Sequence, residues 1–311
     1  MSTSINIFPV MKTRDIHNHH MDSTAWNRFN FRDDDIIIST YAKSGTTWTQ
    51  QIISQLIFDG AEGLKISEMS PWIDLRIMPP EALAALDQQT HRRFVKTHLP
   101  VDALIFSPKA KYIYVGRDGR DMAWSLYNAY ANANDHWYGA LNNTPGRVGP
   151  AIDRPPPTAQ EFFRQWFEQD GYPFWSYWDN VRSWWKLQGL PNVKFVHFND
   201  LKNDLSGSVR DIGDFLGITP DTATLQKITS HCTFDYMKAN AETIVPLGGV
   251  LWEGGAKTFI NKGTNGRWKD ALTPAESRAY EQRAIKELGE ECAAWLAEGS
   301  TEQSEQSRKV A

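Results

Sequence analysis

The stretch Asp35-Ile-Ile-Ile-Ser-Thr-Tyr-Ala-Lys-Ser-Gly-Thr-Thr-Trp48 joins a β-branched run to a short loop with one glycine and then to an apolar segment. Residues 35–40 form a short, isoleucine-rich run, which predicts a buried strand. The next apolar side chains recur at helical spacing through residue 58, and this spacing predicts a helix. They are Trp48, Ile52, Ile53, Leu56 and Ile57. The stretch therefore predicts a strand, a tight loop and a helix in direct succession.

Three further short apolar runs predict buried strands, and helical patterns alternate with them. The predicted strands lie at 94–97, 111–115 and 193–198, and the predicted helices at 121–130, 159–167, 174–187 and 274–297. Strands that alternate with helices are typical of a mainly parallel sheet with helices on both faces. We therefore predict an α/β fold, a single domain with a central, mainly parallel sheet flanked by helices and a P-loop-like loop after its first strand.

This single domain is expected over residues 26–298. The polar residues 1–25 and 299–311 are predicted to be flexible ends. The segment 139–157 is rich in Gly, Pro and Asn, which predicts a long loop of the kind that covers binding sites.

Composition and charge exclude several classes of function. The 311-residue chain has a formal charge of −4, whereas binding to nucleic acid or to a membrane surface usually needs a basic excess. No apolar run is long enough to span a bilayer. Cys232 and Cys292 match no metal or disulfide framework, and His17, His19 and His20 lack partners at ligand spacing. Without a signal-peptide pattern, these features predict a cytoplasmic protein with no metal.

The loop Lys43-Ser-Gly-Thr-Thr47 has the features of an anion site. It follows a predicted strand and opens a helix, so backbone N–H groups and the positive end of the helix dipole meet there. Gly45 allows close approach of an anion, the hydroxyl groups can donate, and Lys43 adds a full charge. A Ser/Thr helix cap with a surface lysine is the alternative, and the preceding buried strand favours the anion site.

A nucleoside triphosphatase is disfavoured. A Walker A loop needs Gly-x-x-x-x-Gly-Lys-Ser/Thr, but Ile37 stands at the first glycine position and Ala42 precedes the lysine. No aspartate ends the strand 111–115 to hold magnesium, because Gly116-Arg117 follows it. A magnesium-dependent phosphoryl-transfer enzyme stays open as a second hypothesis.

Four segments together resemble the PAPS-dependent sulfotransferases, which use 3′-phosphoadenylyl sulfate. Tyr41-Ala-Lys-Ser-Gly-Thr-Thr-Trp48 differs from the family's phosphosulfate loop at one position, Ala42. The others are Lys96-Thr-His-Leu-Pro100, Tyr114-Val-Gly-Arg-Asp-Gly-Arg-Asp-Met-Ala-Trp-Ser125 and Lys262-Gly-Thr-Asn-Gly-Arg-Trp268. All four occur in the family's order. Two further segments, 70–74 and 89–94, look most similar to bacterial glycolipid sulfotransferases.

The resemblance implies sulfuryl transfer from PAPS to an acceptor hydroxyl, with PAP as product and no metal required. His98 would be the general base, because histidine is poised near neutral pH. Taken alone, a single histidine would more often be a core residue. Lys43 would stabilise the leaving phosphate, and Lys96 would steady the sulfuryl group.

The resemblance also implies the donor contacts, which cluster by the part of the nucleotide that they meet. They are Lys43, Ser44, Gly45, Thr46 and Thr47 at the 5′-phosphosulfate, Arg117, Ser125, Lys262 and Gly263 at the 3′-phosphate, and Trp48, Phe198, Cys232, Phe234 and Met237 around the adenine. For Phe198, an ordinary core position is an equal alternative.

The sequence departs from the family at several positions. Asn261 stands where the family has an arginine before the loop lysine, so one charge contact to the 3′-phosphate is missing or supplied elsewhere. A modestly weaker donor affinity is expected. Arg267 stands where the family has aspartate, and Phe198 where it has tyrosine. The dimer motif is degraded over 269–278, which puts that dimer mode in doubt and leaves a homodimer open.

The acceptor would be a small-molecule or lipid hydroxyl, such as a phenol, alcohol, sterol or glycolipid. Some of the 13 tryptophans and 15 phenylalanines are expected to line its pocket. Trp72, Tyr130, Trp137 and Tyr138 are the candidates. A third hypothesis is a non-catalytic sensor of a 3′,5′-bisphosphate nucleotide, and the base His98 argues against it.

Overall fold

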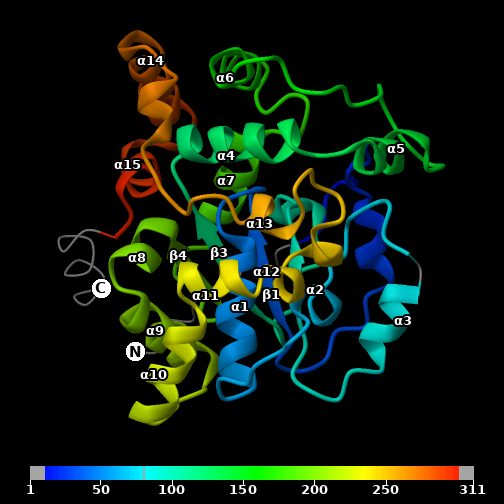
Figure 1. The fold of residues 1–311 in the computed structure, drawn as a ribbon, viewed down its shortest axis with the longest axis vertical. Helices are drawn as coiled ribbons and strands as arrows, with labels where there is room; N and C mark the ends of the chain where they lie inside the picture. The colour runs from blue at the N-terminus through cyan, green and yellow to red at the C-terminus, as the bar shows by residue number, and fades with distance from the viewer. Residues whose placement is uncertain (1–10, 80, 301–311) are drawn as a thin grey trace, which may run out of the picture.

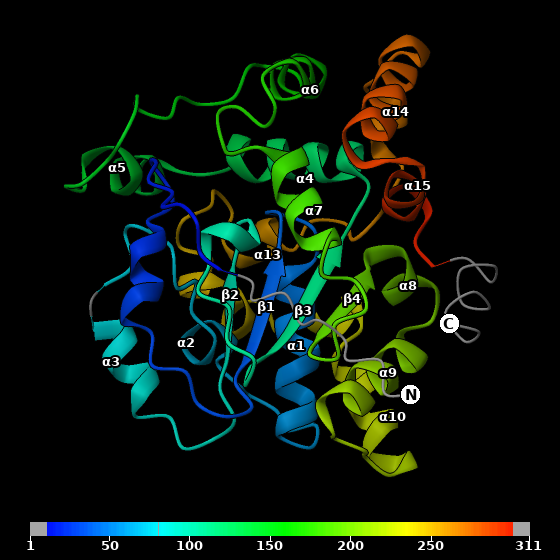
Figure 2. The same ribbon diagram turned by 180° about the vertical axis from the view of Figure 1, so that it is seen from behind.

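A computed structural model describes residues 11–79 and 81–300. Its centre is a sheet with the strand order β2-β1-β3-β4, in which every strand pair is parallel (Figures 1 and 2). The strands are β1 (Ile36–Thr40), β2 (Phe94–Thr97), β3 (Lys111–Gly116) and β4 (Val193–His197). The predicted α/β fold with a central parallel sheet in one domain is confirmed.

The inner strands are buried on both faces, as their unbroken apolar runs predict. Successive side chains of a strand point to opposite faces. In β1, Ile37 joins one core cluster together with Tyr112 and Tyr114 of β3, while Ile36 and Ile38 join another. All three isoleucines are completely buried. Each face of the sheet therefore needs a layer of helices.

Helices from distant parts of the chain supply these layers (Figures 1 and 2). The cluster around Ile36 and Ile38 is completed by α1 (Thr46–Ile57), α9 (Leu205–Leu216) and α10 (Thr222–His231). The cluster around Ile37 is rich in aromatic side chains and is completed by α4 (Gly119–Ala131), α6 (Ala159–Glu168), α7 (Tyr177–Trp185), α14 (Pro274–Leu288) and α15 (Glu290–Glu298).

The other described helices lie mainly in the connections. They are η1 (Ser23–Arg28), α2 (Ile66–Met69), α3 (Glu81–Asp87), η2 (Val101–Ala103), α5 (Asp135–Asn143), α8 (Phe198–Asn203), α11 (Phe234–Ala239), α12 (Ala241–Ile244), η3 (Pro246–Gly249), α13 (Ala256–Phe259) and η4 (Arg267–Asp270), where η denotes a 3-10 helix.

Two predicted segments differ from the structure. The single helix expected over 274–297 is divided at Gly289, whose φ of 81° lies in the left-handed region that glycine adopts without strain. The loop expected over 139–157 begins inside α5. This helix forms because the Asn134 side chain caps it by accepting a hydrogen bond from the Trp137 backbone N–H.

Residues 11–25 pack against the domain, in contrast to the flexible segment expected over 1–25. His20 and Met21 are fully buried. The His20 imidazole is hydrogen-bonded to the Tyr130 hydroxyl, which satisfies a polar group that the sequence alone suggested was exposed.

The remaining parts of both predicted flexible ends, 1–10 and 301–311, lie outside the described residues. Over the described ranges, no helix is long and apolar enough to cross a membrane. No group of His, Cys, Asp and Glu there could hold a metal ion. Cys232 and Cys292 are buried free thiols.

Candidate active site

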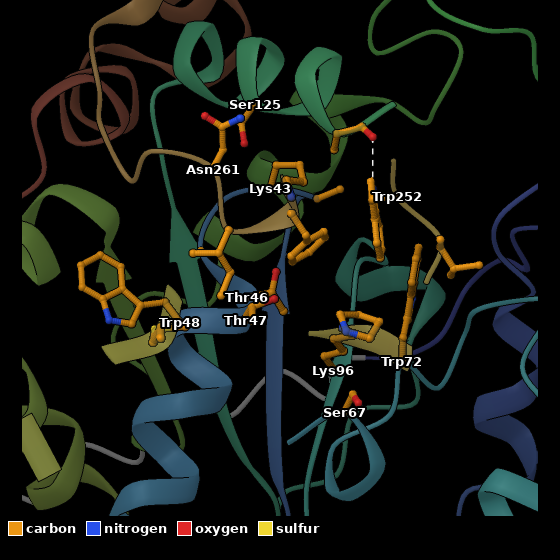
Figure 3. A pocket seen from close by; sticks show the side chains of 18 of the residues that line it. Lys43, Thr46, Thr47, Trp48, Ser67, Trp72, Lys96, Ser125, Trp252 and Asn261 are labelled. Carbon is orange, nitrogen blue, oxygen red and sulfur yellow. Dashed lines mark hydrogen bonds between the residues drawn. The ribbon is translucent and has the colours of Figure 1, made fainter. Parts of the chain in front are cut away.

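The carboxyl ends of β1, β2 and β3 meet at one edge of the sheet, where open α/β sheets bind ligands. A cavity of about 1020 Å³ lies over this edge (Figure 3). Among the described residues, seven basic and two acidic side chains line it, although the whole chain carries a formal charge of −4. The basic residues are therefore concentrated where an anion could bind.

Most of the predicted catalytic and donor residues line this one cavity. They are Lys43, Gly45, Thr46, Thr47, Trp48, Lys96, His98, Arg117, Ser125, Phe198, Phe234, Met237, Lys262 and Gly263. Ser44 and Cys232 are buried and do not line it. The expectation that the Cys232 side chain faces the pocket is corrected, because this thiol packs in the core behind α1. Its carbonyl instead accepts a hydrogen bond from Trp48 Nε1 at 2.8 Å.

The loop after β1 places two residues in the left-handed backbone region. Lys43 and Gly45 have φ values of 67° and 117°. A Cβ on Gly45 would lie 3.1 Å from the Phe198 ring, so close packing also favours glycine here. Thr46 and Thr47 begin α1, and the first N–H groups of a helix have no intrahelical acceptor. These N–H groups and the helix dipole can bind an anion.

His98 is oriented by two neighbouring segments. Its Nδ1 lies 2.8 Å from the Thr40 carbonyl oxygen. Because a carbonyl can only accept, Nδ1 carries the hydrogen and Nε2 is free to take a proton. Asn180 Nδ2 donates to the His98 carbonyl at 2.9 Å. Burial and two nearby lysine charges lower the pKa of His98 to about 3, so the ligand-free imidazole is neutral at pH 7.

Two lysines share the cavity with His98. Lys43 Nζ lies 3.8 Å from the centre of the Phe259 ring. Desolvation and the charges of Arg117 and Lys96 lower the pKa of Lys43 to about 7. Desolvation likewise lowers the pKa of Lys96 to about 8. A bound anion would offset the desolvation of both lysines and raise both pKa values.

Arg117 extends from the end of β3 toward the same loop. It donates to the Lys43 carbonyl at 3.0 Å and to Asn265 Oδ1 at 2.7 Å. Its guanidinium lies 4.1 Å from the centre of the Phe198 ring. Its Nε is buried and, within the described residues, has no hydrogen-bond partner. An unsatisfied donor on a buried cation is the feature expected where an anion binds.

The part of the cavity lined by Lys43, Arg117 and Lys262 is its basic half. Aromatic side chains form the far end of this half. The Trp48 and Phe198 rings meet edge to face, with 5.4 Å between their centres. Phe234 packs so closely on Gly263 that a Cβ there would lie 2.6 Å from its ring. Phe198 is buried and also lines the cavity, so it has a core position, and its contact with adenine stays a prediction.

The other half of the cavity is apolar. Trp72 and Trp137 line it, as predicted, and Trp72 packs edge-on against His98 with 4.6 Å between ring centres. Tyr130 also lines it. Tyr138 does not line it; its hydroxyl donates to the Tyr130 carbonyl at 2.7 Å, and its ring packs in the same core cluster as Trp137.

Several site residues were missed from the sequence. Thr40 could have been found, because β1 and β2 are adjacent and parallel, so the residue that ends β1 lies beside the end of β2. Trp175, Trp252 and Phe259 also line the cavity. No local pattern marks Trp252, whose position depends on a hydrogen bond from its Nε1 to the Ala129 carbonyl at 3.1 Å.

Comparisons with known proteins agree with this geometry. A family model described as Sulfotransferase domain matches residues 33–291. A glycolipid sulfotransferase of Mycobacterium tuberculosis is 34% identical, over 89% of this chain and 92% of its own length. Human sulfotransferase 2B1 is 32% identical, over 86% of this chain and 69% of its own length.

Among solved structures, a mouse sulfotransferase in complex with PAP has a TM-score of 0.67 at 24% identity, and the match covers 92% of this chain and 94% of that one. The likeness supports the fold. The predicted similarity to bacterial glycolipid sulfotransferases is confirmed by the mycobacterial relative. The chain belongs to the family of PAPS-dependent sulfotransferases.

Proposed function

We propose that this chain transfers a sulfuryl group from PAPS to the hydroxyl group of a largely apolar acceptor. One observation carries the proposal: a single cavity joins an anion site, a neutral and oriented histidine, and an apolar wall. His98 contacts Trp72 of the apolar half and is close enough to Lys43 for the lysine charge to lower its pKa.

The residues of the basic half fit PAPS, which carries phosphate groups at both its 3′ and 5′ ends. The N–H groups at the start of α1 suit the 5′-phosphate. Arg117, with its unsatisfied Nε, and Lys262 suit the 3′-phosphate. Trp48 and Phe198 offer ring faces and edges for the adenine. The mouse relative with bound PAP is consistent with this use of the fold.

PAPS supplies the sulfuryl group. A bond forms between the acceptor oxygen and sulfur, the bond from sulfur to the phosphate oxygen breaks, and the hydroxyl proton passes to Nε2 of His98. The Thr40 carbonyl holds Nδ1 in its protonated state and favours the resulting imidazolium. Lys43 balances the charge that develops on the leaving oxygen, and Lys96 steadies the sulfuryl oxygens.

A lipid hydroxyl, such as that of a glycolipid or a sterol, suits the apolar half best. Trp72, Trp137 and Trp252 line this half. At its rim, Leu247 lines the cavity while 67% of its surface is exposed, so apolar contact extends to the opening. The bacterial relatives named glycolipid sulfotransferases point to the same acceptor class.

Ligand-dependent melting temperatures test the donor assignment. PAP should raise the melting temperature well above the effect of AMP or of Mg-ATP, because ligand binding stabilises a fold in proportion to affinity. Equal shifts would refute the 3′-phosphate site. A larger shift with Mg-ATP would favour the phosphoryl-transfer hypothesis.

An acceptor panel of phenols, sterols, alcohols and glycolipid extracts tests the reaction. Transfer to lipid hydroxyls with little transfer to small phenols supports the proposal. Tight PAP binding without transfer to any member would favour the sensor hypothesis. Cytoplasmic localisation, the domain limits 26–298 and a homodimer stay predictions.

A further inference from the structure

The loop after α13 differs from its family pattern at two positions that are six residues apart. Asn261 replaces the usual arginine, and Arg267 replaces the usual aspartate. The pair of changes leaves one guanidinium in the loop but moves it along the chain. The three-dimensional course of the loop decides whether the displaced guanidinium still faces the cavity.

The loop turns back on itself, so the two positions meet. Gly266 has a φ of 80°, and its N–H donates to Asp121 Oδ1 at 2.7 Å, which fastens the turn to α4. Arg267 follows directly, and its Nη1 donates to Asn261 Oδ1 at 3.2 Å. The Arg267 side chain therefore reaches the side chain of residue 261.

The guanidinium of Arg267 is held on the wall of the cavity. It lies 3.4 Å from the centre of the Trp124 ring, and Trp124 is the neighbour of Ser125 on α4. Ser125, Asn261, Lys262 and Arg267 all line the cavity, and Figure 3 draws Ser125 and Asn261 at its upper end. Stacking on tryptophan and a bond to a neutral amide fix the plane of the guanidinium without neutralising its charge.

Arg267 has no anionic partner at ion-pair distance within the described part of the chain. Arg120, on the same helix as Trp124, shows the contrast, since it pairs with Asp118 and Glu281. Among the cavity arginines, Arg117 likewise bonds to carbonyl and amide oxygens. Two guanidinium groups thus face one cavity with their charges unpaired, as expected for a phosphate site.

We propose that Arg267 binds the 3′-phosphate of PAPS and PAP and supplies the charge that Asn261 cannot. The inference rests on the proposed use of PAPS. It also revises the expectation that Asn261 weakens donor affinity, because the loop retains its guanidinium. Asn261 becomes a positioning residue that directs Arg267 through its side-chain oxygen.

Calorimetric titration with PAP and with AMP tests the assignment, because the two nucleotides differ by the 3′-phosphate. Arg267→Ala and Arg267→Gln should each weaken PAP binding by about 10- to 100-fold, the range for a lost charge-assisted contact, and AMP binding by less than about 3-fold. Lys269→Ala, which removes a nearby exposed charge outside the cavity, should leave both affinities unchanged.

A charge exchange provides the second test. Arg267→Asp should weaken PAP binding more than Arg267→Ala, and adding Asn261→Arg to Arg267→Asp should restore most of the lost affinity. Equal losses of affinity for PAP and for AMP in Arg267→Ala and Arg267→Gln would overturn the assignment. An unchanged PAP affinity in these two variants would overturn it as well. If the unaltered protein does not prefer PAP to AMP, the proposed function itself fails.

Discussion

Productive binding of the donor should be lost at a pH well below the usual pKa of a lysine side chain. The pKa of Lys43 is lowered to about 7 by desolvation and by the charges of Arg117 and Lys96. Above this pKa the free enzyme loses the positive charge that meets the phosphosulfate. About 1% of Lys43 would be charged at pH 9, against about 97% for a lysine with an unshifted pKa. The kcat/KM for PAPS should therefore fall at least about 100-fold between pH 6 and pH 9.

The assay is initial-rate sulfation over pH 5.5–9.5 at saturating acceptor. An aliphatic alcohol from the panel serves as acceptor, because its hydroxyl does not titrate in this range. The kcat/KM profile reports the pKa values of the free enzyme. No acid limb from His98 is expected near pH 6.5, since the pKa of His98 is lowered to about 3.

Lys43→Arg is the matched variant, because arginine keeps its charge throughout this range. Its activity should be lower, but its alkaline limb should move to about pH 8, where Lys96 loses its proton. A profile that stays level to pH 9 in the unaltered protein, or a limb near pH 7 that persists in Lys43→Arg, would refute the reasoning.

Two glycine substitutions test close packing. Gly116→Ala places a Cβ 2.2 Å from the Trp295 ring and should lower the free energy of unfolding in urea by about 1–3 kcal/mol. Gly139→Ala, whose Cβ meets its nearest neighbour at 3.8 Å, is the control. Equal stabilities of the two variants would contradict the packing at β3. Gly263→Ala places a Cβ 2.6 Å from the Phe234 ring at a φ of 62°, so it should raise the PAP Kd by about 10-fold. An unchanged Kd would show that this contact does not shape the nucleotide site.

The strands could be predicted almost to the residue because burial on both faces makes each one a continuous apolar run. The predicted bounds of β2, 94–97, are the observed ones. The division of the last helix at Gly289 was missed because the apolar pattern continues on both sides of it, and a single glycine within a helical pattern is often tolerated.

The basic half of the site could also be predicted, because its residues fall in short contiguous motifs at the ends of parallel strands. Lys43, His98 and Arg117 each follow a different strand. The apolar half could not, since Trp252 and Phe259 belong to a segment without periodic pattern whose position depends on contacts with distant helices. One such contact is the bond from Trp252 to the Ala129 carbonyl. The turn that brings Arg267 to Asn261 was hidden for the same reason.

Transfer of labelled sulfate from PAPS by His98→Ala, beside the unaltered protein, tests the central claim most directly. His136→Ala is the control, because this exposed histidine lies outside the cavity. The proposed mechanism predicts that His98→Ala binds PAP as before but loses at least about 100-fold in kcat, the lower range for a general base, while His136→Ala stays active. Undiminished transfer by His98→Ala would contradict the assignment of His98 as the base.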